Sequence, residues 1–213
     1  MLVRATAVGP FQENCYLVAD EQTRDAVLVD PGDEGSRLIA AVEQGAFTLR
    51  ALWITHAHID HVAGIADVKR RFDVPVYLHP LDRPLYDHVV DQARHYGIRI
   101  EAPPAPDHEL AEGDVMRVGG LSFGVMHVPG HAPGHVAFVG HSAVFGGDCL
   151  FAGSIGRTDL PLSDPRALER SLARFSSLPA ETVLYPGHGP ATTIGDENRT
   201  NPFLTGAARL IRR

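Results

Sequence analysis

The sequence predicts an α/β fold in which two β-sheets pack against each other and helices cover the outside. Short β-rich runs pair as hairpins, and amphipathic helical segments separate the groups of strands. Hydrophobic residues make up 44% of the 213 residues, enough for a substantial core. The only stretch that resembles a linker is the Pro-rich run Glu101–Asp107, and the motifs described below lie on both sides of it. We therefore expect a single domain over residues 1–213.

The first half of the chain alternates strands with helices. The β-rich runs Cys15–Ala19 and Ala26–Asp30 flank a polar turn and predict a hairpin. Asp33 suits a helix N-cap, and apolar residues recur at helical spacing from there to Gln44. Beyond it the pattern predicts, in order, a strand, a helix, a strand and a mostly helical segment: Ala51–Thr55, Ile59–Phe72, Val74–Leu78 and Leu81–Tyr96.

The second half is richer in strands. The pattern predicts four of them close together, at Asp114–Val118, Leu121–Val128, Val136–Gly140 and Ala143–Gly147. A helix at Pro165–Phe175 and a strand at Thr182–Tyr185 follow, and one or two short helices are expected in residues 189–213.

Charge and cysteine content narrow the class of protein. The formal net charge is −7, which argues against nucleic acid or an anionic membrane surface as the partner. Cys15 and Cys149 are the only cysteines, too few for a disulfide framework. Neither a signal peptide nor an apolar run long enough to span a bilayer is evident, so a cytoplasmic location is expected.

Histidine is unusually frequent, with 12 in the chain, and part of it is clustered. His56, His58, Asp60 and His61 form an H-x-H-x-D-H motif where a predicted strand ends and a helix begins. Histidines two apart in an extended turn can aim at one point, and the next two side chains can aim at a second point beside it. Imidazole and carboxylate groups suit zinc and related first-row metals. The motif therefore predicts a metal site.

Three further residues of the same chemistry follow predicted strands. His131 lies in Val128–His135, Asp148 ends Val144–Asp148, and His188 lies in Tyr185–Pro190. In each case a strand delivers the side chain, and Gly or Pro turns the backbone beside it.

Together these motifs resemble the metallo-β-lactamase superfamily over essentially the whole chain. The resemblance implies an αβ/βα sandwich of two mixed sheets flanked by helices. It also implies two divalent metal ions, with zinc expected and iron or manganese as the other choices. His56, His58 and His131 would hold one ion, and a second set with a bridging carboxylate would complete the site: Asp60, His61, His188 and the bridging Asp148.

Within the superfamily, Gly147–Asp159 and Pro186–Gly195 resemble the short bacterial glyoxalase II-like proteins. The resemblance implies hydrolysis of S-lactoylglutathione or a related small-molecule thioester, with Asp60 and Asp148 as catalytic residues. Metal-activated water would attack the carbonyl, and a thiolate leaves without a strong acid. Arg157 matches a basic residue that contacts glutathione, whereas Asp159 replaces an aromatic one. The C-terminal glutathione-binding domain is not expected in residues 189–213.

Other members of the superfamily fit less well. Class B1 β-lactamases lack the His that follows Asp60 and have Cys in place of the bridging Asp, which argues against antibiotic hydrolysis. The main alternative is a persulfide dioxygenase, which shares the H-x-H-x-D-H pattern and a sequence like Gly156–Asp159. That resemblance would place a single iron on His56, His131 and Asp148. The full ligand set favours hydrolysis, and a binding module without chemistry is a third alternative.

Three more residues lie close to the motifs. We expect His135 to orient the metal ligands through hydrogen bonds rather than bind metal. Cys149 should pack in the core, because neighbours along a strand point to opposite faces. Asp30 precedes Pro-Gly, and the sequence favours equally a role near the site and ordinary turn chemistry.

Overall fold

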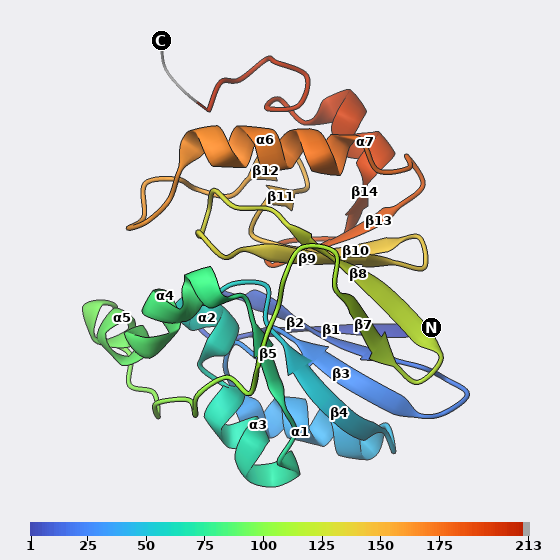
Figure 1. Ribbon diagram of the computed structural model, residues 1–213, viewed down its shortest axis with the longest axis vertical. Helices are drawn as coiled ribbons and strands as arrows, with labels where there is room; N and C mark the ends of the chain where they lie inside the picture. The colour runs from blue at the N-terminus through green and yellow to red at the C-terminus, as the bar shows by residue number, and fades with distance from the viewer. Residues whose placement is uncertain (211–213) are drawn as a thin grey trace.

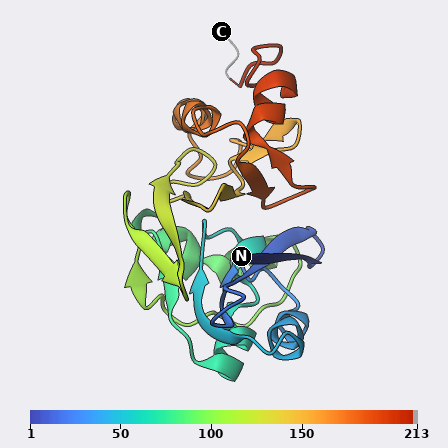
Figure 2. The same ribbon diagram turned by 90° about the vertical axis from the view of Figure 1, so that its right-hand side faces the viewer.

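The computed structural model describes residues 1–210 and shows four layers (Figure 1). Helices α1 (Gly35–Gln44) and α3 (Ile65–Phe72) cover one sheet, and α6 (Pro165–Ser176) and α7 (Ile194–Thr200) cover the other. The turned view in Figure 2 shows the same separation into two halves. Across residues 1–210, no helix is long and apolar enough to cross a membrane.

The first sheet has six strands in the order β1-β2-β3-β4-β5-β6. It begins with antiparallel pairs and continues with parallel ones, so the predicted hairpin is present as β2 and β3. Strand β1 was not predicted. The bounds are β1 Leu2–Val8, β2 Glu13–Ala19, β3 Asp25–Val29, β4 Thr48–Trp53, β5 Val76–Leu78 and β6 His108–Glu109.

The second sheet also has six strands, in the order β14-β13-β10-β9-β8-β7. Its four central strands agree with the prediction to within one residue at each end, because each is bounded by a tight turn. The bounds are β7 Val115–Val118, β8 Leu121–His127, β9 Val136–Gly140, β10 Ala143–Gly147, β13 Val183–Pro186 and β14 Thr192–Thr193. A separate small hairpin joins β11 (Leu150–Phe151) to β12 (Ser154–Ile155).

The predicted helix Ile59–Phe72 is wrong as a single element. It divides at Gly64 into α2 (Ile59–Val62) and α3. The Gly64 N–H donates to the Pro31 carbonyl at 2.9 Å, and a Cβ on Gly64 would lie only 2.8 Å from that oxygen. Contact with the loop after β3 therefore interrupts the helix, and a sequence pattern does not reveal that contact.

Two other helical predictions also need correction. The N-cap of α1 is Glu34 in the left-handed region, not Asp33, and its side chain makes no capping bond. The Leu81–Tyr96 segment is divided into a 3-10 turn and two helices, α4 (Arg83–Asp87) and α5 (Val89–His95). One short helix, α7, follows His188 as expected, and the part of that prediction in residues 211–213 lies outside the described residues.

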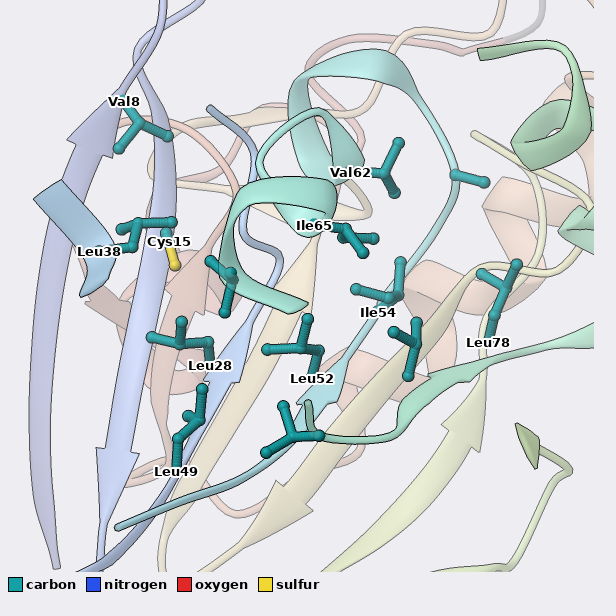
Figure 3. Close-up of a cluster of buried hydrophobic side chains, with 14 of the residues drawn as sticks. Val8, Cys15, Leu28, Leu38, Leu49, Leu52, Ile54, Val62, Ile65 and Leu78 are labelled. Carbon is teal, nitrogen blue, oxygen red and sulfur yellow. The ribbon is translucent and has the colours of Figure 1, made fainter. Parts of the chain in front are cut away.

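The hydrophobic core has three parts, one between each pair of layers. Leu28 and Leu52 pack under α1 and α3, as Figure 3 shows. Between the sheets, Trp53 contacts Phe138 with ring centroids 5.2 Å apart. Beneath α6, Phe175 packs against the second sheet. Because alternate residues of β2, β3 and β4 face different layers, each strand contributes to two cores.

We expect Phe138→Ala to lower the free energy of unfolding by about 3–5 kcal/mol, because it opens a cavity between the two sheets. Urea denaturation measures this. Val115→Ala, at a strand position that is 52% exposed, is the control and should change it by less than about 0.5 kcal/mol. A similar effect of both substitutions would contradict the placement of Phe138 in the inter-sheet core.

Candidate metal centre

The H-x-H-x-D-H motif and the three later residues meet where the two sheets join. The motif follows β4 of the first sheet, and the loops after β8, β10 and β13 of the second sheet carry the others. Hydrogen bonds hold the sheets together there. The Val136 N–H donates to the Thr55 carbonyl at 2.8 Å, and the Asn14 N–H donates to the Gly187 carbonyl at 2.7 Å.

The structure gathers these side chains into two sets. The ligand atoms of His56, His58 and His131 lie within 4.8 Å of one another. His58 Nδ1 and His131 Nε2 are only 2.8 Å apart. The second set meets the same criterion and consists of Asp60, His61 and His188.

Asp148 lies between the two sets. Its Oδ2 is 3.6 Å from His131 Nε2 and 3.5 Å from His188 Nε2, and its Oδ1 is 3.4 Å from His61 Nε2. One carboxylate therefore faces histidines of both sets. This is the place that a bridging ligand would occupy.

Hydrogen bonds fix the orientation of three of the rings. His56 Nδ1 lies 3.1 Å from Thr55 Oγ1, His61 Nδ1 lies 3.0 Å from Asp30 Oδ2, and His131 Nδ1 lies 2.8 Å from the Arg157 carbonyl. Each bond engages Nδ1 and leaves Nε2 directed at the centre. Such partners orient imidazole ligands in metal sites.

Asp30 belongs to this supporting layer. Beyond His61, it accepts hydrogen bonds from the Thr55 N–H at 2.7 Å and from Thr55 Oγ1 at 2.6 Å. Asp30, His56 and His61 form a third set by distance alone. Because both Asp30 oxygens already accept hydrogen bonds, we assign Asp30 to orientation rather than to a further ion.

His135 and Cys149 lie beside the centre. His135 Nε2 accepts a hydrogen bond from the Asp148 N–H at 3.0 Å, and its ring stacks on His56 with centroids 4.7 Å apart. It therefore contacts two members of the candidate ligand set. Cys149 is fully buried in the core beneath α6.

The imidazoles of the centre differ in protonation, although burial disfavours the charged form of each. The carboxylates of Asp148 and Asp60 raise the pKa of His61 well above its usual value. Burial lowers the pKa of His56 well below its usual value and that of His58 to about 3. Burial alone would raise the pKa of Asp148, but the charge of His61 holds it below its ordinary value. Neutral histidine and ionised carboxylate are the protonation states in which these groups bind metal.

The donor set fits divalent metal ions. Within the described residues, His56 Nε2, His61 Nε2 and Asp148 Oδ1 are buried and have no hydrogen-bond partner. Buried polar atoms without partners are costly, and a cation that binds them removes that cost. These atoms come from both sets and from the carboxylate between them, so the donors of both sets are available to a divalent metal.

Two buried carboxylates near the centre were not singled out in the sequence. Asp82 accepts hydrogen bonds from the N–H groups of Ala57 and Gly134, so it ties the H-x-H-x-D-H loop to the His131 loop. Glu13 is fully buried, and its Oε1 lies 3.8 Å from His61 Nδ1. Neither lies in a recognisable motif, and only the fold brings them to the centre.

Arg157 and Asp159 lie on the surface beside the centre, a region that we call the mouth. The Arg157 carbonyl accepts the hydrogen bond from His131, whereas the guanidinium is exposed. Nε and Nη2 contact the two carboxylate oxygens of Asp159 at 2.6 and 2.8 Å. The arginine thus lies near the candidate ligands, and its charge is paired with Asp159.

The fold and the centre define a class of protein. The family model of the metallo-beta-lactamase superfamily matches residues 8–188, and the chain belongs to that superfamily. The predicted fold class is thereby confirmed. Membership supports a metal-binding hydrolase as the coarse function.

Among curated relatives, the chain is similar to the hydroxyacylglutathione hydrolase GloC of Haemophilus influenzae. The two are 37% identical over 209 residues, which cover 96% of this chain and 98% of GloC. This likeness agrees with the predicted resemblance to glyoxalase II-like proteins.

Solved structures of the same fold carry varied names. TTHA1623, in a di-iron-bound form, is 51% identical with a TM-score of 0.88, and covers 95% of this chain and 100% of its own. The BLEG-1 B3 metallo-beta-lactamase is 37% identical with a TM-score of 0.90, over 96% and 100%. ETHE1 from Myxococcus xanthus is 30% identical with a TM-score of 0.81, over 97% and 85%. The fold alone therefore does not select one substrate.

We expect Asp82→Asn to remove a pH dependence from the stability of the chelator-treated protein. Burial raises the pKa of Asp82 to about 6, above its ordinary value of 3.8, although the bonds from Gly134 and Ala57 oppose this. The protonated carboxyl group therefore favours folding below pH 4. This contribution, roughly 3 kcal/mol, is lost as the pH rises through 6.

Urea unfolding of the wild type and the variant between pH 4 and pH 7 measures this effect. The free energy of unfolding of the wild type minus that of Asp82→Asn should fall across this window. A difference that stays constant would contradict the raised pKa.

Proposed function

We propose that the protein is a binuclear metal-dependent hydrolase that cleaves S-lactoylglutathione or a related small-molecule thioester. The observation that carries the proposal is the position of Asp148 between two sets of histidine-rich ligands, with one of its oxygens buried and without a partner. The likeness to GloC supports the choice of a thioester.

In this proposal His56, His58 and His131 would hold one ion, and Asp60, His61 and His188 would hold the other. Asp148 would serve both. Zinc is our first choice because nitrogen and oxygen ligands in this number suit it, and iron or manganese fits the same donors. The di-iron form of TTHA1623 supports iron as the main competitor.

Two bound ions would supply a water of lowered pKa and Lewis acidity toward a carbonyl oxygen. The chain's own residues supply the rest. Asp60, which lies 3.2 Å from His188 Nε2, accepts a hydrogen bond from the attacking water and orients it. Asp30 and Thr55 hold His61 and His56 in place. The leaving thiolate has an ordinary pKa near 8.5, so no strong acid is needed.

Other parts of the proposal follow from the same site. Arg157, at the mouth, contacts the thiol portion of the substrate. Residues 1–213 act as one domain, because the ligands of each ion come from both sheets. The substrate is a small molecule rather than nucleic acid, as the net charge of −7 favours, and the site of action is the cytoplasm.

A second candidate is a mononuclear iron persulfide dioxygenase. His56, His131 and Asp148 form a subset of two histidines and one carboxylate, which is the ligand pattern of such iron sites. The Gly156–Asp159 sequence favours it, whereas the second set around His61 supports hydrolysis.

We expect the purified protein to contain two metal ions per chain by elemental analysis and to cleave S-lactoylglutathione. Asp148→Ala should lower kcat/KM by at least about 100-fold, because even the partners of metal ligands contribute 10–100-fold. Asp67→Asn, which removes an exposed carboxylate on α3, is the control and should retain both the metal and the activity.

The same preparations are tested with a β-lactam and, by oxygen uptake, with glutathione persulfide. One iron per chain with oxygen uptake and no thioester cleavage would replace the proposal with the dioxygenase. Faster cleavage of the β-lactam than of any thioester would overturn the substrate class.

A further inference from the structure

The charge at the mouth of the centre has a consequence for the choice of substrate, which rests on the proposed function. We propose that Asp159 neutralises Arg157, so that the mouth favours thioesters with an uncharged, apolar thiol portion a few-fold over anionic ones such as S-lactoylglutathione, which the centre still cleaves. Asp159 is then a specificity-determining residue, because it disfavours substrates that carry a carboxylate on their thiol portion.

The geometry of the Arg157–Asp159 ion pair favours its formation. Two nearly parallel contacts, at 2.6 and 2.8 Å, join the guanidinium to both carboxylate oxygens, the bidentate geometry that is most specific for arginine. The two partners are only two residues apart in the chain, so forming the ion pair costs little conformational entropy of the backbone. The Arg157 carbonyl is also held by His131, which anchors the pair to the centre.

Asp159 is ionised at neutral pH. The hydrogen bond from Arg157 lowers the pKa of Asp159 to about 2. An anionic group on a substrate therefore competes with a permanently charged carboxylate for the guanidinium. The pair is exposed, so water weakens this competition and the expected discrimination is a few-fold.

The neighbouring wall is apolar and acidic rather than basic. Phe11 and Tyr96 meet edge to face with centroids 5.2 Å apart, and both are partly exposed. Phe11 also lines a recess whose walls are mostly apolar, with Pro10, Ile59 and Ile98 among the lining residues. The titratable side chains in this lining are the carboxylates of Asp33 and Asp60.

These features act in the same direction. The aromatic pair offers contact area to an apolar chain, and Asp33 adds negative charge near the recess. A carboxylate placed there is repelled by Asp33 and finds the Arg157 guanidinium already paired. An uncharged thiol portion meets neither penalty.

A matched pair of thioesters tests the inference. S-lactoyl-N-acetylcysteine carries a carboxylate on its thiol portion, and S-lactoyl-N-acetylcysteamine lacks only that group. We expect the wild type to have the higher kcat/KM with the neutral thioester. Asp159→Asn should raise kcat/KM for the anionic thioester by about 3-fold, within the range for exposed charge pairs, and leave the neutral one unchanged.

The control is Asp67→Asn, which removes an exposed carboxylate paired with Arg70 and makes the same change in net charge. It should leave the ratio of the two kcat/KM values as in the wild type. The inference is overturned if Asp159→Asn leaves this ratio unchanged. It is also overturned if the wild type prefers the anionic thioester, because Arg157 would then be free to bind a carboxylate.

Binding of the corresponding S-propyl thioethers, which cannot be hydrolysed, separates this inference from the proposed function. Calorimetric titration of the metal-loaded protein should show the same preference for the neutral compound, reduced in Asp159→Asn. If neither thioester is cleaved but this preference is found, the thioesterase proposal fails and the selectivity stands. If cleavage is found without any preference in binding or turnover, the selectivity fails and the thioesterase stands.

Discussion

The constraint on which the rest of the structure depends is the burial of ligand atoms that have no partner within the described chain. His56 Nε2, His61 Nε2 and Asp148 Oδ1 are each held in a low-dielectric space where an unpartnered polar atom is costly. The surroundings must therefore be rigid enough to prevent these side chains from turning outward. His56 and Asp148 follow the ends of strands, and His61 lies on the short helix α2. The Thr55 hydroxyl, the His135 imidazole and the Asp30 carboxylate, respectively, contact these residues and hold them in place.

The carboxylates divide the work by their environment. Asp148 faces three histidines and stays ionised, whereas Asp82 accepts hydrogen bonds only from backbone N–H groups and holds its proton more tightly. Asp159 is on the surface, and its ion pair with one arginine lowers its pKa. The carboxylate group therefore has three roles: Asp148 is a candidate metal ligand, Asp82 connects two loops through hydrogen bonds, and Asp159 neutralises the charge of Arg157.

Local patterns in the sequence predicted much of this arrangement. Strands β9 and β10 were predicted with their observed ends, since turns bound them, and the H-x-H-x-D-H motif marked the centre. What the sequence did not reveal depends on contacts between distant segments. The break at Gly64 requires the loop at Pro31, and the role of Asp82 requires two loops that are more than 70 residues apart in the chain. Hydrophobic periodicity reflects local structure only and does not indicate contacts between distant segments.

The ligand candidates come from both sheets, and this links the centre to the assembly of the fold. The H-x-H-x-D-H motif belongs to the first sheet, whereas His131, Asp148 and His188 belong to the second. An ion bound by members of both groups would join the two halves, which also meet through apolar side chains and through backbone hydrogen bonds at Thr55 and Asn14. Metal binding would therefore be coupled to the docking of the halves, and removal of the metal would loosen the junction between the two sheets.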